Sequence, residues 1–188
     1  MSVNADASSS SAGTTVRPLR RIVTSHDPAD VDGENVTFHD DAVPLKSVLD
    51  GQAHISPLYS STGIPAHNPH VVTSQHIADA VAAVPGVVFP GGTNCQVTEL
   101  APNFKVGMHR TSSIDHNIIV EGSATLIVPD GKGGERRTVV RAGEVVVQTG
   151  TIHAWEAGPE GARWITVVVA ANPVEIPDQQ KKLEDVDF

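Results

Sequence analysis

Short runs of β-branched and apolar residues dominate the second half of the chain, and a turn signal closes each of them. Glycine, proline, asparagine or serine separates one run from the next. Short strands at such close spacing are typical of an antiparallel sandwich or barrel. We therefore predict an all-β domain with strands over Cys95–Leu100, Lys105–His109, His116–Glu121, Ala124–Val128, Arg137–Val140, Val145–Gln148, Ile152–Trp155 and Ile165–Ala170.

The first half of the chain is richer in turn residues and has fewer apolar runs. It contains extended pieces at Arg20–Thr24 and Val36–His39. Because such β runs are not stable alone, we expect residues 20–60 to pair with the barrel or with a second subunit, giving a homodimer. One short helix is predicted over Thr73–Val84, where a hydroxyl residue caps the start and a Pro-Gly pair ends the helix.

These patterns divide the chain into four predicted segments. They are a disordered tail (1–15), an N-terminal arm (16–91), a β-barrel (92–172) and a C-terminal tail (173–188). A chain of 188 residues is long enough for one domain with its own core.

Composition excludes several classes of protein. The 13 Lys+Arg and 22 Asp+Glu give a net charge of −9, which disfavours nucleic acid as a partner. No apolar run approaches the roughly 18 residues that span a bilayer, so we expect no membrane insertion. The start of the chain lacks the features of a secretory signal, so we expect a cytoplasmic protein. The single cysteine, Cys95, excludes an intramolecular disulfide and is interpreted as a small buried hydrophobe.

Three histidines and one carboxylate in the β region are the strongest candidates for chemistry. Side chains alternate along a strand, so His109 and Asp115 can share the inner face while His116 points outward. With His153 from a neighbouring strand, two imidazoles and a carboxylate form a set that binds a divalent metal such as Fe, Zn, Ni or Mn. Two alternatives stay open: Asp115 only caps a turn, or a register slip of one residue brings His116 inward.

The same alternation predicts the wall of a ligand cavity. Thr111 and Asn117 are in phase with Asp115, and the apolar or aromatic part of the wall is expected to be Ile119, Trp155 and Val97. Such a wall suits a small, mostly apolar substrate with one or two oxygen atoms.

A second group of histidines occurs at His67, His70 and His76. Pro69 holds this segment extended, and no carboxylate or cysteine lies nearby in the sequence. We interpret it as a surface loop that happens to contain histidines.

Two segments, GMHRTSSIDHNIIVEGSATL and RAGEVVVQTGTIHAWE, resemble the paired signature segments of the cupin superfamily. In that match His109 takes the first histidine position, Asp115 the glutamate position and His153 the histidine of the second segment. The chain departs from the pattern at Thr111, which replaces the second histidine, and at Asn103, which replaces the first glycine. The opening RRIVTSHD is similar to that of small single-domain cupins found beside small-molecule tailoring genes.

The resemblance implies a single jelly-roll-like barrel that holds one divalent metal, and an enzyme that acts on a small organic molecule. We expect dehydration, isomerisation or decarboxylation of a small polyketide-like or hydroxy-carbonyl compound, with the metal as Lewis acid and His116 as base. An Fe(II)-dependent dioxygenase is the alternative enzyme. A non-catalytic protein that binds a small ligand is the alternative outside enzymes, favoured by Thr111 because a hydroxyl is a poor metal ligand.

Overall fold

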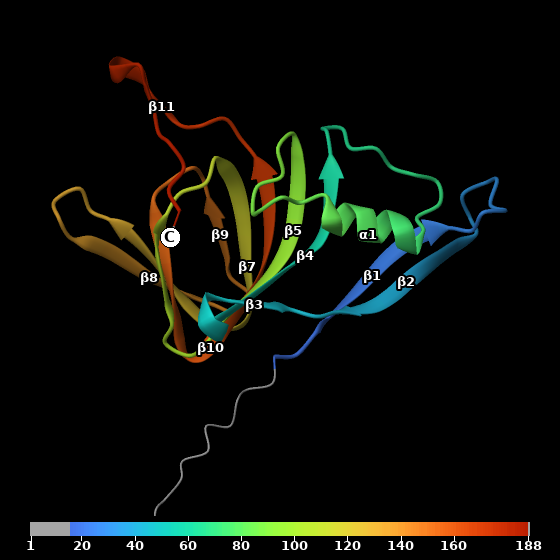
Figure 1. Ribbon diagram of the computed structural model, residues 1–188, viewed down its shortest axis with the longest axis horizontal. Helices are drawn as coiled ribbons and strands as arrows, with labels where there is room; N and C mark the ends of the chain where they lie inside the picture. Colours follow the sequence, from blue (N-terminus) through green and yellow to red (C-terminus); the bar gives the residue numbers. More distant parts are fainter. Residues whose placement is uncertain (1–15, 188) are drawn as a thin grey trace, which may run out of the picture.

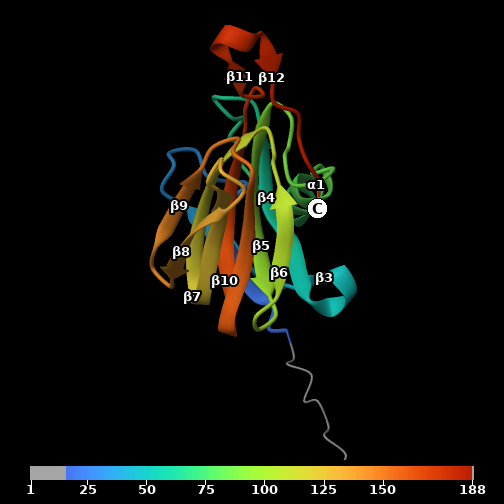
Figure 2. The ribbon, with the colours of Figure 1, turned by 90° about the vertical axis from the view of Figure 1, so that its left-hand side faces the viewer.

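In a computed structural model, which describes residues 16–187, the largest element is one eight-stranded antiparallel sheet that curves into a barrel (Figures 1 and 2). The path of the sheet is β3-β4-β5-β10-β7-β8, with β6 beside β10 and β9 beside β7. The predicted all-β barrel is confirmed; the predicted tail at residues 1–15 lies outside the described part. The strands are β3 (Lys46–Val48), β4 (Ala53–Thr62), β5 (Gly92–Leu100), β6 (Lys105–His109), β7 (Ser113–Pro129), β8 (Glu135–Arg141), β9 (Val145–Gln148) and β10 (His153–Ala170).

Two strands, β7 and β10, are far longer than predicted, at 17 and 18 residues. The sequence predicts a turn at Glu121-Gly122 and another at Gly158–Gly161. Instead, β7 stays paired at Glu121-Gly122, and the two strands pair on both sides of residues 158–161, which form a bulge opposite Ser123. Gly122 has a φ of +66°, and a Cβ atom there would lie 2.2 Å from the Gly161 carbonyl oxygen. Glycine therefore allows two strands to bend together where a larger residue would force them apart.

Part of the predicted arm belongs to the barrel sheet. Strand β4 pairs with β5 from Ala53 opposite Leu100 to Thr62 opposite Gly92, so the expected pairing of the arm with the barrel is confirmed for this strand. It was not predicted as a strand because Pro57 and several serines interrupt its apolar pattern. By contrast, β1 (Leu19–His26) and β2 (Val36–Val43) form a hairpin that extends away from the barrel (Figure 1).

The predicted helix is present as α1 (Ser74–Ala82). Thr73 caps it, since its side chain accepts a hydrogen bond from the His76 N–H. The helix packs on β4, where the Ser60 hydroxyl donates to the Ala80 carbonyl. Shorter elements are η1 (Leu49–Gly51), β11 (Glu175–Ile176), η2 (Pro177–Gln179) and β12 (Lys181–Lys182). Among residues 16–187, no helix has the length and apolar character to span a membrane.

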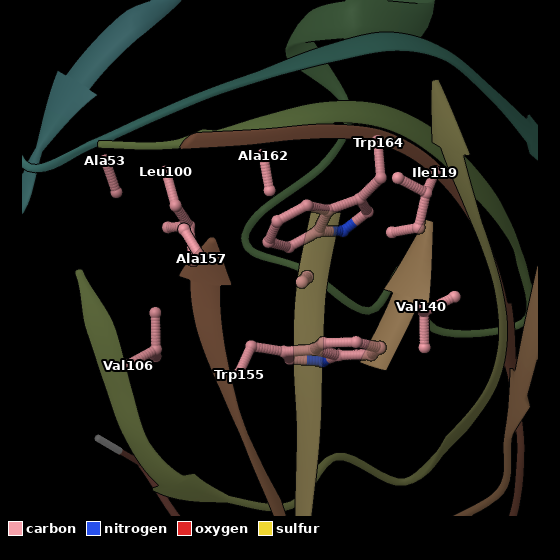
Figure 3. Close-up of a cluster of buried hydrophobic side chains, with 10 residues drawn as sticks. Ala53, Leu100, Val106, Ile119, Val140, Trp155, Ala157, Ala162 and Trp164 are labelled. Carbon is pink, nitrogen blue, oxygen red and sulfur yellow. The ribbon is translucent and has the colours of Figure 1, made fainter. Parts of the chain in front are cut away.

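Buried apolar side chains form two clusters on opposite faces of β5. The larger cluster lies inside the barrel, where Trp155 and Trp164 pack with ring centroids 5.8 Å apart (Figure 3). It consists of Ala53, Leu100, Val106, Ile119, Ala124, Val140, Trp155, Ala157, Ala162 and Trp164. The smaller cluster, Val43, Leu58 and Val97, joins the arm to the outside of the sheet. Strand β5 is therefore buried on both faces.

Candidate active site

A cavity of about 390 Å³ lies in the barrel beside the two tryptophans. Its wall combines apolar side chains with polar ones from five strands and from the loop between β6 and β7. The polar members are Gln96, Thr98, His109, Thr111, Asp115, Asn117, Gln148, His153 and Thr166.

The most distinctive feature of the cavity is a pair of imidazoles. His109 on β6 and His153 on β10 are cross-strand partners, and their ring centroids are 4.2 Å apart. The Nδ1 atom of His109 lies 2.9 Å from the Gly107 carbonyl oxygen, and that of His153 lies 2.9 Å from the Thr151 carbonyl oxygen. A carbonyl oxygen only accepts hydrogen bonds, so each Nδ1 carries the proton and the lone pair of each neutral ring is on Nε2.

Burial keeps both rings neutral. It lowers the pKa of His109, and it lowers the pKa of His153 to about 4, against the opposing effect of the hydrogen bond to Thr151. A neutral imidazole with one nitrogen fixed by a backbone carbonyl is the form in which histidine binds metals.

Asp115 is buried in the same wall but does not complete a compact set with the two histidines. Its Oδ2 accepts a hydrogen bond of 3.4 Å from Gln148, while its Oδ1 has no partner among the described residues. Burial raises the pKa of this carboxyl, although Ser113 partly offsets the effect. Among residues 16–187, only one group of three potential ligands has all its ligand atoms within 4.8 Å of one another, and it lies elsewhere.

Several polar residues of the wall were missed by sequence reasoning: Gln96, Thr98, Gln148 and Thr166. The Thr166 hydroxyl donates to Asn117 Oδ1 at 2.8 Å, which leaves Asn117 Nδ2 without a partner among the described residues. Gln148 Oε1 is also buried without a described partner. Unpaired buried amides are costly in a protein interior, so these groups point to a polar ligand. The signal was in the sequence: Gln96 and Thr98 alternate with Val97.

Three of the predicted wall residues line the cavity, one lies in the core beside it, and two other predicted site residues point away from it. Thr111, Asn117 and Trp155 line the cavity, and Ile119 lies in the core cluster rather than in the lining. Val97 was expected to line it but points to the opposite face of β5, because that strand is buried on both sides. His116, predicted as a catalytic base, is exposed on the outer face of β7, because the strand keeps its regular alternation after Asp115. The cavity wall is therefore more polar than expected and lacks this base.

A C-terminal segment closes one side of the cavity. Arg110 and Val186 exchange two backbone hydrogen bonds, of 3.0 and 2.9 Å, and the Ser112 hydroxyl donates to Asp185. Asp185, Val186 and Asp187 consequently form part of the cavity lining. Two further carboxylates thus lie at its edge.

The donor set fits a divalent metal through its two nitrogens. The fixed tautomer of each ring suits a metal ligand, and the Oδ1 atom of Asp115, which has no partner among the described residues, is a further oxygen donor in the same wall. Thr111, at the position of the usual second histidine, instead shares a hydrogen bond of 2.8 Å with the Ser113 hydroxyl. The ligand roles of His109, Asp115 and His153 stay a prediction.

Comparison with known proteins identifies relatives along most of the chain, although no protein-family model matches it. Phomopsin biosynthesis cluster protein D of Diaporthe leptostromiformis is 28% identical over 163 residues, 86% of this chain and 83% of the relative. Oryzines biosynthesis cluster protein J of Aspergillus oryzae is 30% identical over 124 residues, 65% of this chain and 67% of the relative.

A third relative is named for its domain. The cupin-domain-containing oxidoreductase virC of Hypocrea virens is 27% identical over 165 residues, which cover 85% of this chain and 81% of the relative. The domain for which this relative is named agrees with the barrel and with the resemblance of this chain to the cupin superfamily. The chain belongs to the cupin superfamily, and its relatives include proteins of fungal biosynthesis clusters.

Proposed function

We propose that the protein is a metal-dependent enzyme that dehydrates, isomerises or decarboxylates a small polyketide-like or hydroxy-carbonyl compound. The observation that carries this proposal is the pair of neutral imidazoles, His109 and His153, facing each other in a cavity with unpaired amide and carboxyl groups. A cavity of about 390 Å³ accommodates a small organic molecule and not a polymer. The biosynthetic names of the relatives support a small-molecule substrate.

His109, His153 and, less directly, Asp115 would hold the metal. A bound divalent ion supplies a Lewis acid that polarises a carbonyl group. In the dehydration of a β-hydroxy ketone, the oxygen of Asp115 that does not hold the metal takes the proton from the carbon next to the carbonyl and returns it to the hydroxyl group, which leaves as water. Asn117 Nδ2 donates a hydrogen bond to the substrate, and Trp155 and Trp164 exclude water from one side of it.

A second candidate is an oxygen-dependent oxidation at the same residues. It is favoured by the name oxidoreductase that several relatives carry. A two-histidine, one-carboxylate site with open positions is also the usual setting for non-haem Fe(II) oxygenases. A non-catalytic ligand-binding protein is the third reading.

Turnover without oxygen separates these functions. A panel of β-hydroxy ketones is incubated with the metal-loaded protein under strict anaerobiosis and in air, and formation of the conjugated enone is followed by ultraviolet absorbance. Equal turnover in both atmospheres, lost in His153→Gln, supports the proposal. Turnover that requires and consumes oxygen would mean that the protein is a dioxygenase. Binding without turnover in either atmosphere would mean that it is a non-catalytic binding protein.

We also propose that the protein forms a homodimer through the β1–β2 hairpin. Within the described chain this hairpin pairs with no other strand, and it exposes Ile22 (51%) and Phe38 (62%). Exposed apolar side chains on a projecting hairpin are stabilised when a second copy covers them. Light scattering at micromolar concentration is expected to give a dimer mass that Phe38→Glu converts to a monomer. A monomeric unmodified protein would rule the dimer out.

A further inference from the structure

Three potential metal ligands converge outside the barrel, at the end of the arm hairpin. His26 is the last residue of β1, Asp30 lies in the turn before β2, and His70 lies in the loop before α1. One ligand atom from each of the three residues lies within 4.8 Å of the other two. The sequence analysis placed His70 in an ordinary surface loop because no carboxylate lies near it in the sequence. The fold brings the carboxylate of Asp30 to it.

Asp30 is the fixed centre of this group. Its side chain is fully buried, and its Oδ1 accepts hydrogen bonds from the Gly33 and Asn35 N–H groups at 3.0 and 3.3 Å. Burial acts to raise the pKa of this carboxyl, but the hydrogen bonds from Asn35, His26 and Gly33 outweigh it and hold the pKa at about 2. The carboxylate is therefore ionised at neutral pH and fixed in orientation.

The two imidazoles face the other oxygen of this carboxylate. Oδ2 lies 2.6 Å from His26 Nδ1 and 4.0 Å from His70 Nε2. The two rings are stacked, with centroids 5.2 Å apart and an interplanar angle of 20°. Within residues 16–187 Asp30 forms an ion pair with neither lysine nor arginine, so its buried negative charge has only these imidazoles as counterparts.

Backbone contacts hold the loop in place, so the convergence does not depend on the side chains alone. The His26 N–H donates to the His70 carbonyl at 3.3 Å, and the Val72 N–H donates to the Ser25 hydroxyl at 2.9 Å. From β2, the ring of His39 donates to the Val72 carbonyl at 2.6 Å. Both strands of the hairpin therefore anchor the same loop.

From this geometry we infer a second, structural metal site, in which His26, Asp30 and His70 bind a zinc-like divalent cation. Two nitrogens and one carboxylate oxygen suit Zn²⁺ and neighbouring transition metals, whereas Mg²⁺ and Ca²⁺ prefer oxygen ligands alone. Two ligands of one tetrahedral zinc lie about 3.4 Å apart, between the 2.6 and 4.0 Å separations in the group. The site is independent of the function proposed for the barrel.

A divalent cation can bind after small movements of the His26 and His70 side chains. The side chains of His26 and His70 are 38% and 54% exposed, so a cation can enter from solvent and water can supply the fourth ligand. Ligation through His26 Nδ1 replaces the hydrogen bond that this nitrogen forms with Asp30 Oδ2. The bound ion would tie the hairpin to the loop that leads into α1.

Zinc binding to the full chain tests this inference in a background that removes the barrel histidines. The variant with His109→Gln and His153→Gln is stripped with a chelator and titrated with Zn²⁺ alone by calorimetry, and bound metal is counted by elemental analysis. We expect one zinc per chain. Adding His70→Ala or Asp30→Asn should weaken binding at least 10-fold, whereas His67→Ala, in the same loop but outside the group, should leave it unchanged.

Two results would overturn the inference. One is a background variant that binds no zinc; the other is a His70→Ala protein that binds zinc as tightly as the His67→Ala control. Nitrogen NMR of the ring atoms gives a second readout, because His26 and His70 signals should shift with zinc while that of His67 stays. His70 is exposed, so its substitution tests the site even where Asp30→Asn impairs folding. The difference in bound zinc between the unmodified chain and the variant with His109→Gln and His153→Gln measures the barrel site alone.

Discussion

His109 and His153 occupy directly opposed positions on the antiparallel strands β6 and β10, so sheet pairing itself brings the two imidazoles together. Each ring is also fixed by a backbone carbonyl two residues earlier in its own strand or turn. Neither histidine therefore depends on a flexible loop for its position. Such rigid placement is what a metal or substrate site needs.

The first prediction concerns metal in the barrel. His153→Gln removes one of the two nitrogen donors and should lower the affinity for divalent metal at least 10-fold. His116→Gln changes a histidine on the outer face of the same wall and should leave the affinity unchanged. Calorimetric titration in a His70→Ala background, which removes the arm site, measures this difference. Equal affinities of the two variants would contradict the metal role of His153.

The second prediction concerns the bend shared by β7 and β10. Gly122→Ala places a Cβ atom 2.2 Å from the Gly161 carbonyl oxygen and should lower the free energy of unfolding by about 3 kcal/mol or more. Gly131→Ala is the matched control, because Gly131 also has a positive φ but nothing lies within 4 Å of an added Cβ. It should cost only about 1 kcal/mol. Urea denaturation of both variants makes the comparison, and equal losses would mean that φ strain alone matters.

The third prediction concerns the C-terminal segment over the cavity. Val186→Pro removes the N–H that bonds to the Arg110 carbonyl, so the segment should open more often. Extraction of metal from the barrel by a chelator should then become several-fold faster. Val186→Ala keeps the N–H and should retain the original rate. If both variants release metal at the unmodified rate, the segment does not control access.

The fourth prediction concerns Cys95. Burial raises the pKa of its thiol, so less of the reactive thiolate is present at any pH below that value. Alkylation by iodoacetamide at pH 8 should be at least about 10-fold slower than that of a free thiol. The rate should still be rising above pH 9. Unfolding in urea should abolish the difference, whereas a plateau below pH 8.5 in the folded protein would contradict the burial effect.

The sequence was sufficient to predict the barrel, the helix and the position of the two histidines on the wall. The barrel and the helix follow from local signals, β-branched runs and the Thr73 cap, and the two histidines follow from the resemblance of their segments to the cupin signatures. Val97 was misplaced because alternation tells which residues share a face but not which face is inside. On a strand buried on both sides, the polar face of Gln96 and Thr98 lines the cavity instead.

Other features depend on contacts that no local pattern encodes. Sequence reasoning placed turns at Gly122 and Gly158–Gly161, because glycine permits either a turn or a bulge and only the partner strand decides between them. The approach of His70 to His26 likewise depends on how a loop folds back over the hairpin. Both contacts join residues that lie far apart in the sequence, so the pattern within one segment does not predict them.

The bulge at residues 158–161 has a consequence for how the barrel tolerates changes in chain length. Strand β10 pairs with β6 and β7 before the bulge and with β5 and β7 after it, so inserting or deleting one residue in either regular half would invert side chains against two neighbours. Within the bulge the same change leaves both halves of the strand in register, because four residues already lie opposite Ser123. His153 and Trp155 lie before this point and Trp164 and Thr166 after it. Length variation during the evolution of this barrel is therefore expected to concentrate there, where it alters neither half of the cavity.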